Sequence, residues 1–335
     1  MVSRCRAPEI SDTLLIPCGF VLLKAGFERM NHPNFLCIGA QKAGTTWLQK
    51  ALEHHPDVYL PRKEIHFFDR DPSYPSPSFL AESNPVRRFL NKDNRTRNVQ
   101  IIRALLKSAL TLNGERFRFF TRFFLTIDDQ WYADLFATRH PYKVKGDITP
   151  SYSILTKADV RKIRDINPAM KIVFIMRNPV YRDWSACRYN VSRHGHVVDS
   201  LAYFDREEMM LRGNYLRTID NYSAFFPDRQ ILYCFYDELK ASPRNFYERV
   251  CRFLDIPPRN ETLLTGKVNK SPDMDFTPAV KSYLAARHLP QLEKLAVKFG
   301  GYCENWLREA QEIIKLGETS GLNHTTASSV RITSM

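Results

Sequence analysis

Residues 39–46, Gly-Ala-Gln-Lys-Ala-Gly-Thr-Thr, have the residue types best suited to bind an anion. An apolar segment typical of a buried strand, residues 35–38, precedes them, and an apolar segment typical of a helix, residues 47–52, follows. Backbone N–H groups at the start of a helix are common phosphate ligands. Lys42 adds a positive charge, and Thr45 and Thr46 add hydroxyl groups. We therefore predict a strand–loop–helix unit that binds a phosphate-like group.

The position of the lysine separates this loop from the loop of nucleoside-triphosphate hydrolases. That loop reads G-x-x-x-x-G-K-[ST], with lysine directly after the second glycine. Here Thr45 follows Gly44, and Lys42 lies inside the loop. The sequence thus predicts phosphate binding in a manner different from that of an NTPase.

Residues 63–69, Lys-Glu-Ile-His-Phe-Phe-Asp, place a carboxylate and an imidazole two positions apart. If this segment ends a second strand, alternation puts Glu64 and His66 on one face. Ligands of open α/β sheets bind beyond the carboxyl ends of the strands, so Glu64 would approach the anion held by Lys42. There it could accept a proton from an attacking hydroxyl. Taken alone, the segment is equally compatible with a surface glutamate beside a histidine at the core edge.

A third candidate is Arg177-Asn-Pro, which follows the apolar residues 171–176, together with Ser185 about two helical turns later. An arginine at a strand end can bind a phosphate with two parallel hydrogen bonds. The alternative is an ion pair with a nearby carboxylate. This segment alone does not separate the two.

The elements that must position these residues alternate between strand-like and helix-like segments. Strands are predicted near residues 35–38, 63–69, 142–145, 171–176 and 230–235, and helices are predicted between and after them. This order predicts an α/β fold with a central, mostly parallel sheet flanked by helices. We expect a weakly structured segment at residues 1–32, one domain at 33–310 and a disordered tail at 311–335.

Residues 71–128 are predicted to be an insertion that is partly helical and strongly basic. The chain has 335 residues and a formal charge of +13, which favours an anionic partner. Ten lysines and arginines lie between residues 87 and 122, interleaved with phenylalanines. The segment 86–125 can hold an anionic glycan or lie on an anionic membrane. The alternative is a cap that packs its phenylalanines on the sheet and leaves its arginines in solvent. Nucleic acid is not expected, because no binding motif accompanies the charge.

Cysteine spacing bears on metal binding, and hydropathy bears on the cellular compartment. The seven cysteines include no C-x-x-C pair, so no metal site is predicted. No apolar run reaches the roughly 18 residues of a membrane-spanning helix. The segment 14–23 is shorter and contains Pro17 and Gly19. We predict a cytoplasmic protein; a Golgi-luminal or membrane-associated one is the alternative if this segment is a degenerate anchor.

Four motifs together resemble the carbohydrate sulfotransferases, in particular the heparan-sulfate-type O-sulfotransferases and their bacterial-type relatives. They are Lys42-x-Gly-Thr-Thr, Lys63-Glu-Ile-His-Phe-Phe-Asp, Gly146-Asp-Ile-Thr-Pro-Ser-Tyr, and Arg177-Asn-Pro with Ser185. The resemblance spans roughly residues 34–306 with gaps. It implies the P-loop-like sulfotransferase fold and transfer of a sulfuryl group from 3′-phosphoadenosine 5′-phosphosulfate to a hydroxyl or amine, with a glycan or glycolipid as the expected acceptor and no metal.

The resemblance also implies roles for individual residues. Glu64 is the general base and His66 assists it in positioning the acceptor or the sulfuryl group, while Lys42 neutralises charge on the bridging oxygen of the donor. The remaining donor ligands are Ala43, Gly44, Thr45 and Thr46 for the 5′-phosphosulfate, and Arg177 and Ser185 for the 3′-phosphate.

The chain departs from the heparan-type pattern in two places. Ile148 stands where those enzymes often have lysine, and their cysteine-flanked Lys-Gly-Arg loop has no clear match. Lys270 is the nearest substitute for that loop as a donor ligand. These departures favour a bacterial-type or divergent member. The alternative functions are a P-loop nucleotide kinase and a non-catalytic binder of anionic glycan or membrane.

Overall fold

The computed structural model describes residues 32–61, 64–75, 79–194, 198–259, 274–319 and 331–332. A five-stranded sheet with the order β2-β3-β1-β4-β6 lies at its centre, and every neighbouring pair is parallel. This arrangement confirms the predicted α/β fold with a central parallel sheet. The strands are β1 (Phe35–Gly39), β2 (Val58–Tyr59), β3 (Val144–Ile148), β4 (Lys171–Met176) and β6 (Ile231–Phe235).

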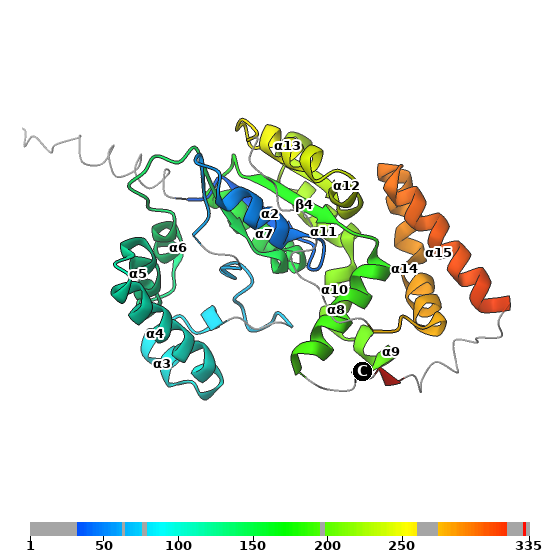
Figure 1. The fold of residues 1–335 in the computed structure, drawn as a ribbon, viewed down its shortest axis with the longest axis horizontal. Coiled ribbons are helices and arrows are strands. Elements are labelled where there is room, and N and C mark those ends of the chain that lie inside the picture. The colour runs from blue at the N-terminus through cyan, green and yellow to red at the C-terminus, as the bar shows by residue number, and fades with distance from the viewer. Residues whose placement is uncertain are drawn as a thin grey trace, which may run out of the picture.

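The helices lie on both sides of this sheet, with the insertion at one end of the molecule and the α14–α15 hairpin at the other (Figure 1). No described helix is long and apolar enough to cross a membrane. A separate antiparallel pair joins β5 (Val198–Asp199) to β7 (Arg331–Ile332). The helices outside the insertion are α2 (Thr45–Glu53), α7 (Lys157–Ile166), α8 (Pro179–His194), α9 (Ser200–Phe204), α10 (Glu207–Gly213), α11 (Tyr215–Ser223), α12 (Tyr236–Ala241), α13 (Pro243–Phe253), α14 (Pro278–Phe299) and α15 (Tyr302–Thr319), with a 3₁₀ turn, η4 (Pro150–Ile154).

The insertion is a cluster of short helices around one longer helix. Its elements are η1 (Phe79–Ala81), α3 (Pro85–Leu90), η2 (Lys92–Asn94), α4 (Arg95–Leu110), α5 (Gly114–Thr121) and η3 (Arg122–Phe124), and α6 (Asp129–Leu135) follows it. Phe119, Phe120 and Phe123 are buried, as expected for a cap packed on the domain. Arg88 is also fully buried, and its guanidinium donates to the carbonyl oxygens of Glu82, Ser83, Phe123 and Leu125 at 2.7–3.0 Å.

The structure corrects the sequence prediction at several places. Residues 64–69 form a loop and not a strand, because their N–H groups bond to the end of β3 instead of a strand ladder. The third strand begins at Val144 and continues through Ile148. The helical region predicted after residue 200 is divided into α9, α10 and α11. Helix α15 continues to Thr319, because Ile313 and Ile314 pack against the core and Gly317 is buried, so residues 311–319 are helical and not part of a disordered tail.

Candidate active site

The loop between β1 and α2 has the geometry of an anion site. Gly39 and Gly44 have φ angles of 150° and 93°, and a Cβ on Gly44 would lie 2.6 Å from Leu239 Cδ2. The N–H of Ala40 donates to the carbonyl oxygen of Ile175 at 2.7 Å, which fixes the loop to β4. Gly44 is the N-cap of α2 and offers no side-chain cap, and no acidic residue occupies the first turn. The positive end of the helix dipole is therefore available to an anion beside Lys42.

The end of β4 and helix α8 lie next to this loop. Arg177 Nη1 donates to the carbonyl oxygen of Lys42 at 3.0 Å. The Lys42 Nζ atom lies 4.1 Å from the ring centroid of Tyr189 on α8. Ser185 is buried one helical turn before Tyr189, on the side of α8 that meets the loop. Burial lowers the pKa of Arg177, whose guanidinium carbon lies 4.8 Å from the ring centroid of Tyr236.

The loop that carries Glu64 and His66 is held by the end of β3. The N–H of Glu64 donates to the carbonyl oxygen of Ile148 at 3.0 Å, the N–H of Ile65 to Thr149 Oγ1 at 2.9 Å, and the N–H of Phe67 to the Tyr152 hydroxyl at 3.0 Å. These contacts replace a regular strand and hold the backbone on both sides of His66. Ile148, Thr149 and Tyr152 of the Gly146–Tyr152 motif thus hold the Glu64 loop by direct hydrogen bonds.

A buried carboxylate orients the two hydroxyls that hold this loop. Thr149 and Tyr152 each donate to Asp147 at 2.7 Å, and Tyr132 donates to the same carboxylate at 3.1 Å. Because each hydroxyl donates its hydrogen bond to Asp147, its lone pairs accept the hydrogen bonds from the N–H groups of Ile65 and Phe67. Burial raises the pKa of Asp147 to about 6, although these three hydrogen bonds act in the opposite direction.

The surroundings of His66 favour the charged form of its imidazole. Its Nδ1 atom lies 2.8 Å from Asp69 Oδ2, and its Nε2 atom lies 3.9 Å from Glu64 Oε2. Burial disfavours the charged imidazole, but the hydrogen bonds and charges of Asp69 and Glu64 outweigh it and raise the pKa of His66 to about 9. Nδ1–H donates to the buried Asp69, which aims the other ring nitrogen toward Glu64.

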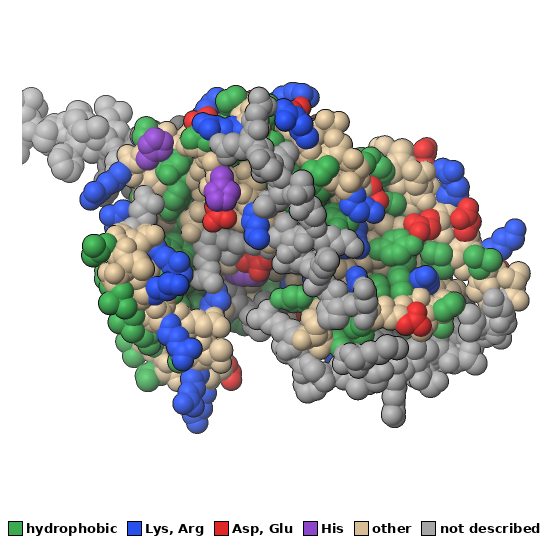
Figure 2. Space-filling model, viewed as in Figure 1, with side chains coloured by type: hydrophobic (Ala, Val, Ile, Leu, Met, Phe, Trp, Pro, Cys, Tyr) green, Lys and Arg blue, Asp and Glu red, His purple; other side chains and the backbone are tan. Residues whose placement is uncertain are grey.

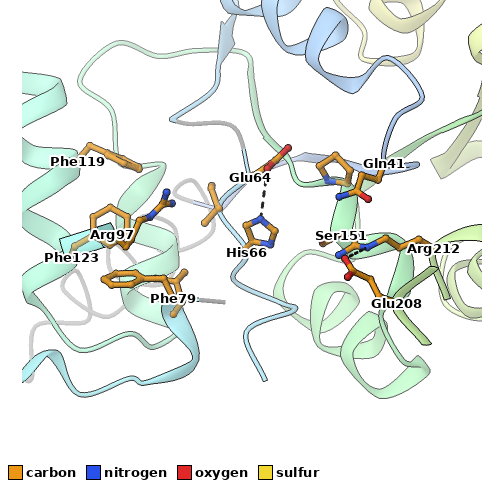
Figure 3. A pocket seen from close by; sticks show the side chains of 13 residues that line it. Gln41, Glu64, His66, Phe79, Arg97, Phe119, Phe123, Ser151, Glu208 and Arg212 are labelled. Atoms are coloured by element: carbon orange, nitrogen blue, oxygen red, sulfur yellow. Dashed lines mark hydrogen bonds and ion pairs between the residues drawn. The ribbon is translucent and has the colours of Figure 1, made fainter. Parts of the chain in front are cut away.

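A cavity of about 400 Å³ joins the Glu64 loop to the anion loop and to the insertion. Gln41, the neighbour of Lys42, lines it together with Glu64 and His66. Figure 3 shows Glu64 and His66 between two groups, with Arg97 and phenylalanines of the insertion on one side and Gln41, Ser151, Glu208 and Arg212 on the other. Arg212 is buried and donates to Ser151 Oγ and Glu208 Oε1, each at 2.9 Å.

Arg97 on α4 is the cation that the insertion contributes to the cavity. Its guanidinium points toward Glu64 in Figure 3, and its Nε atom is buried without a hydrogen-bond partner. Burial lowers the pKa of Arg97, and the charge of Glu64 counteracts this. Phe79, Phe119 and Phe123 form the apolar wall beside it. The cavity therefore offers both positive charge and aromatic surface.

The backbone conformation of Lys42, Glu64 and His66 is also unusual. Five non-glycine residues of the described chain have positive φ, and three of them are Lys42, Glu64 and His66, at 70°, 61° and 60°. Such conformations cost about 1–3 kcal/mol each and cluster at functional sites. The sequence analysis singled out these three side chains but gave no indication of their conformation.

Most predicted site residues lie in two groups, the anion loop with the end of β4 and the loop of Glu64 and His66. Gln41 of the anion loop lines the same cavity as Glu64 and His66. Ala43 and Thr45 are buried and Thr46 is half-buried at the start of α2. Lys270 lies outside the described residues. Gln41, Arg97 and the hydroxyls around Asp147 were not assigned as site residues. The Gly146–Tyr152 motif was the one sequence signal that could have indicated the hydroxyls.

Comparison with known proteins places this site in a family. Residues 33–261, more than half of the chain, match the model of the sulfotransferase family, and the chain belongs to that family. Human heparan sulfate glucosamine 3-O-sulfotransferase 3B1 is 23% identical over 261 residues, covering 75% of this chain and 52% of that protein. Mouse heparan sulfate glucosamine 3-O-sulfotransferase 6 is 25% identical over 246 residues, covering 69% and 55%. The chain thus spans about half the length of these relatives.

A solved structure has the same fold. The crystal structure of a sulfotransferase from Alicyclobacillus acidocaldarius aligns with a TM-score of 0.58 and 21% identity, covering 82% of this chain and 98% of that one. The predicted fold family and the assignment as a transferase enzyme are confirmed.

Proposed function

We propose that the chain transfers a sulfuryl group from 3′-phosphoadenosine 5′-phosphosulfate to a hydroxyl of a glycan-type acceptor. The observation that carries this proposal is the shared cavity, which brings Glu64 and His66 to the loop that contains Gln41 and Lys42. The candidate base thus lines the same space as Gln41 of the candidate anion loop, which supports the approach of an acceptor to the donor that an in-line displacement requires.

The donor half of the proposal rests on the loop and on β4. The start of α2 and the Lys42 ammonium supply positive charge for the 5′-phosphosulfate. Arg177 and Ser185 bind the 3′-phosphate from the adjoining strand end and helix. The contact of Arg177 with the Lys42 carbonyl supports this arrangement, because it ties the two phosphate sites together.

The reaction then needs one proton transfer at Glu64. The acceptor oxygen forms its bond to sulfur while the bond between sulfur and the bridging oxygen of the donor breaks. Glu64 takes the hydroxyl proton, and Lys42 stabilises the negative charge on the departing phosphate oxygen. The His66 imidazolium lies beside Glu64 and faces negative charge on the transferring group.

The acceptor class follows from the cavity and the relatives. The relatives named above act on heparan sulfate glucosamine, which supports a sugar hydroxyl as the acceptor. Aromatic rings such as Phe79, Phe119 and Phe123 offer flat surface to the apolar face of a sugar, and Arg97 can pair with an anionic substituent.

Incubation with ³⁵S-labelled donor and a panel of glycans, glycolipids and small alcohols tests the proposal. We expect label on an acceptor that carries a sugar hydroxyl, and label formed about a hundredfold more slowly with Glu64→Gln. Magnesium-dependent ATP turnover by the same preparation, with no sulfuryl transfer, would instead identify a nucleotide kinase. Glycan binding without any transfer would identify a non-catalytic binder.

A further inference from the structure

Helix α4 has a row of apolar side chains that are exposed to solvent. Val99, Ile102, Leu106 and Leu110 are 40%, 44%, 60% and 85% exposed, and we call these four residues the apolar stripe. At 3.6 residues per turn they lie within about 80° of one another. The residues that α4 buries against the domain are Asn98, Ile101 and Ser108. The helix is therefore amphipathic with an apolar side that the described chain leaves uncovered.

This surface is concentrated in the insertion. Of the fourteen large hydrophobic residues that are exposed in the described chain, ten lie between residues 86 and 125. Besides the stripe they include Val86 and Leu90 of α3 and Leu112 after α4. Scattered exposed hydrophobic side chains are ordinary, but a contiguous group on one element marks an interaction surface.

Exposed cations border the stripe. Arg103 and Lys107 follow it along one edge of α4, and Arg95 lies at the start of the same helix. Exposed cations on the neighbouring elements are Arg87, Lys92, Arg116 and Arg118. Between residues 87 and 122 the sequence has two acidic residues, Asp93 and Glu115. Figure 2 shows green side chains along this outer edge of the molecule and blue side chains directly beside them.

We propose that the apolar stripe of α4 docks on a lipid bilayer with anionic headgroups. An interfacial helix places its apolar side at the acyl boundary and its lysines and arginines at the headgroups, which is the arrangement seen here. A second copy of the chain is a poorer partner, because a two-fold interface would bring the same cations against one another. Arg97 lies about 160° around the helix from Val99, so docking leaves the cavity side of α4 uncovered.

Vesicle flotation of the full chain tests this inference. The protein should bind vesicles of equal parts phosphatidylglycerol and phosphatidylcholine, bind pure phosphatidylcholine weakly, and release as salt increases. Leu106→Glu combined with Leu110→Glu should weaken binding at least about tenfold, because both side chains enter the acyl boundary. Arg103→Gln and Lys107→Gln should each weaken it about fivefold.

Val297→Glu is the matched control. Val297 is 91% exposed on α14, outside the insertion, so a glutamate introduced there should leave vesicle binding unchanged. Circular dichroism should show all variants folded, since each changed side chain faces solvent. Equal binding to both vesicle types, or full binding by the Leu106/Leu110 variant, overturns the proposal. A dimer that this variant converts to monomer, with vesicle binding unchanged, would show a self-association surface instead.

Discussion

One wall of the cavity is formed by the Glu64 loop, which is held at the end of β3, and another by the insertion. We call them the sheet wall and the insertion wall, and the two are held in different ways. Glu64 and His66 are fixed by hydrogen bonds to the end of β3 and by the buried Asp147. Arg97 is carried by α4, a helix whose outer side faces solvent. Under the proposed function, the sheet wall holds the reacting groups in a fixed geometry and the insertion wall contacts the acceptor.

Lys42→Ala should have the largest effect, because it removes the ammonium group of the anion loop, whose Gln41 lines the same cavity as Glu64 and His66. We expect transfer to fall about a thousandfold, with weaker binding of adenosine 3′,5′-bisphosphate. Calorimetry of nucleotide binding and ³⁵S transfer measure the two effects. Unchanged nucleotide affinity would remove Lys42 from the donor site.

Glu64→Gln should lower kcat about a hundredfold and leave nucleotide affinity unchanged, because the amide cannot take the acceptor proton. The side chain keeps its size, so a folding defect is not expected. If this variant kept full turnover, the base would have to be another group.

Arg97→Met and Arg88→Met form a matched pair within the insertion, of which only Arg97 lines the cavity. Arg97→Met should raise the acceptor KM about tenfold with nucleotide affinity unchanged, since one charged contact is lost. Arg88→Met should instead lower the free energy of unfolding by more than about 3 kcal/mol, because four carbonyl groups lose their donor. Steady-state kinetics and denaturant unfolding separate these outcomes, and the reverse pattern would contradict the assignment.

Tyr152→Phe and Tyr132→Phe test how the Glu64 loop is held. Both remove a hydrogen bond to Asp147, but Tyr152 also accepts from the N–H of Phe67. Tyr152→Phe should therefore cost about 2 kcal/mol of stability and lower kcat several-fold. Tyr132→Phe should affect stability alone. Equal kcat values for the two variants would show that the Phe67 contact does not position the base.

The smallest expected effect is the pH dependence that His66 gives to stability. Its pKa is about 9 in the folded chain against an ordinary value of 6.5, so the folded state binds this proton more tightly. The resulting stabilisation is fully present below pH 6.5 and is lost as the pH rises through 9. The Tm of the wild type should thus fall relative to His66→Gln by at least about 2 °C over this window. If the Tm values of the wild type and of His66→Gln changed in parallel over this pH window, the ion pairs of His66 with Asp69 and Glu64 would be contradicted.

The sequence by itself determined the local units of this protein. The β1 loop and α2 are contiguous, so the apolar strand, the glycines, Lys42 and the threonines predicted a strand–loop–helix unit, which the structure has at these residues. The apolar residues 171–176 likewise specified β4 with its bounds unchanged. For the phenylalanines of the insertion, composition left open whether they pack as a cap, and the structure buries Phe119, Phe120 and Phe123.

Only the tertiary structure decided how the second half of the site is made. Glu64 and His66 were expected on a strand, but hydrogen bonds to residues about 84 positions away give them left-handed backbone conformations. Arg88 and Arg97 belong to the same basic segment, yet one binds carbonyl groups in the interior and the other faces the cavity. Local sequence encodes such residue types, whereas partners brought together by the sheet decide their conformation and their surroundings.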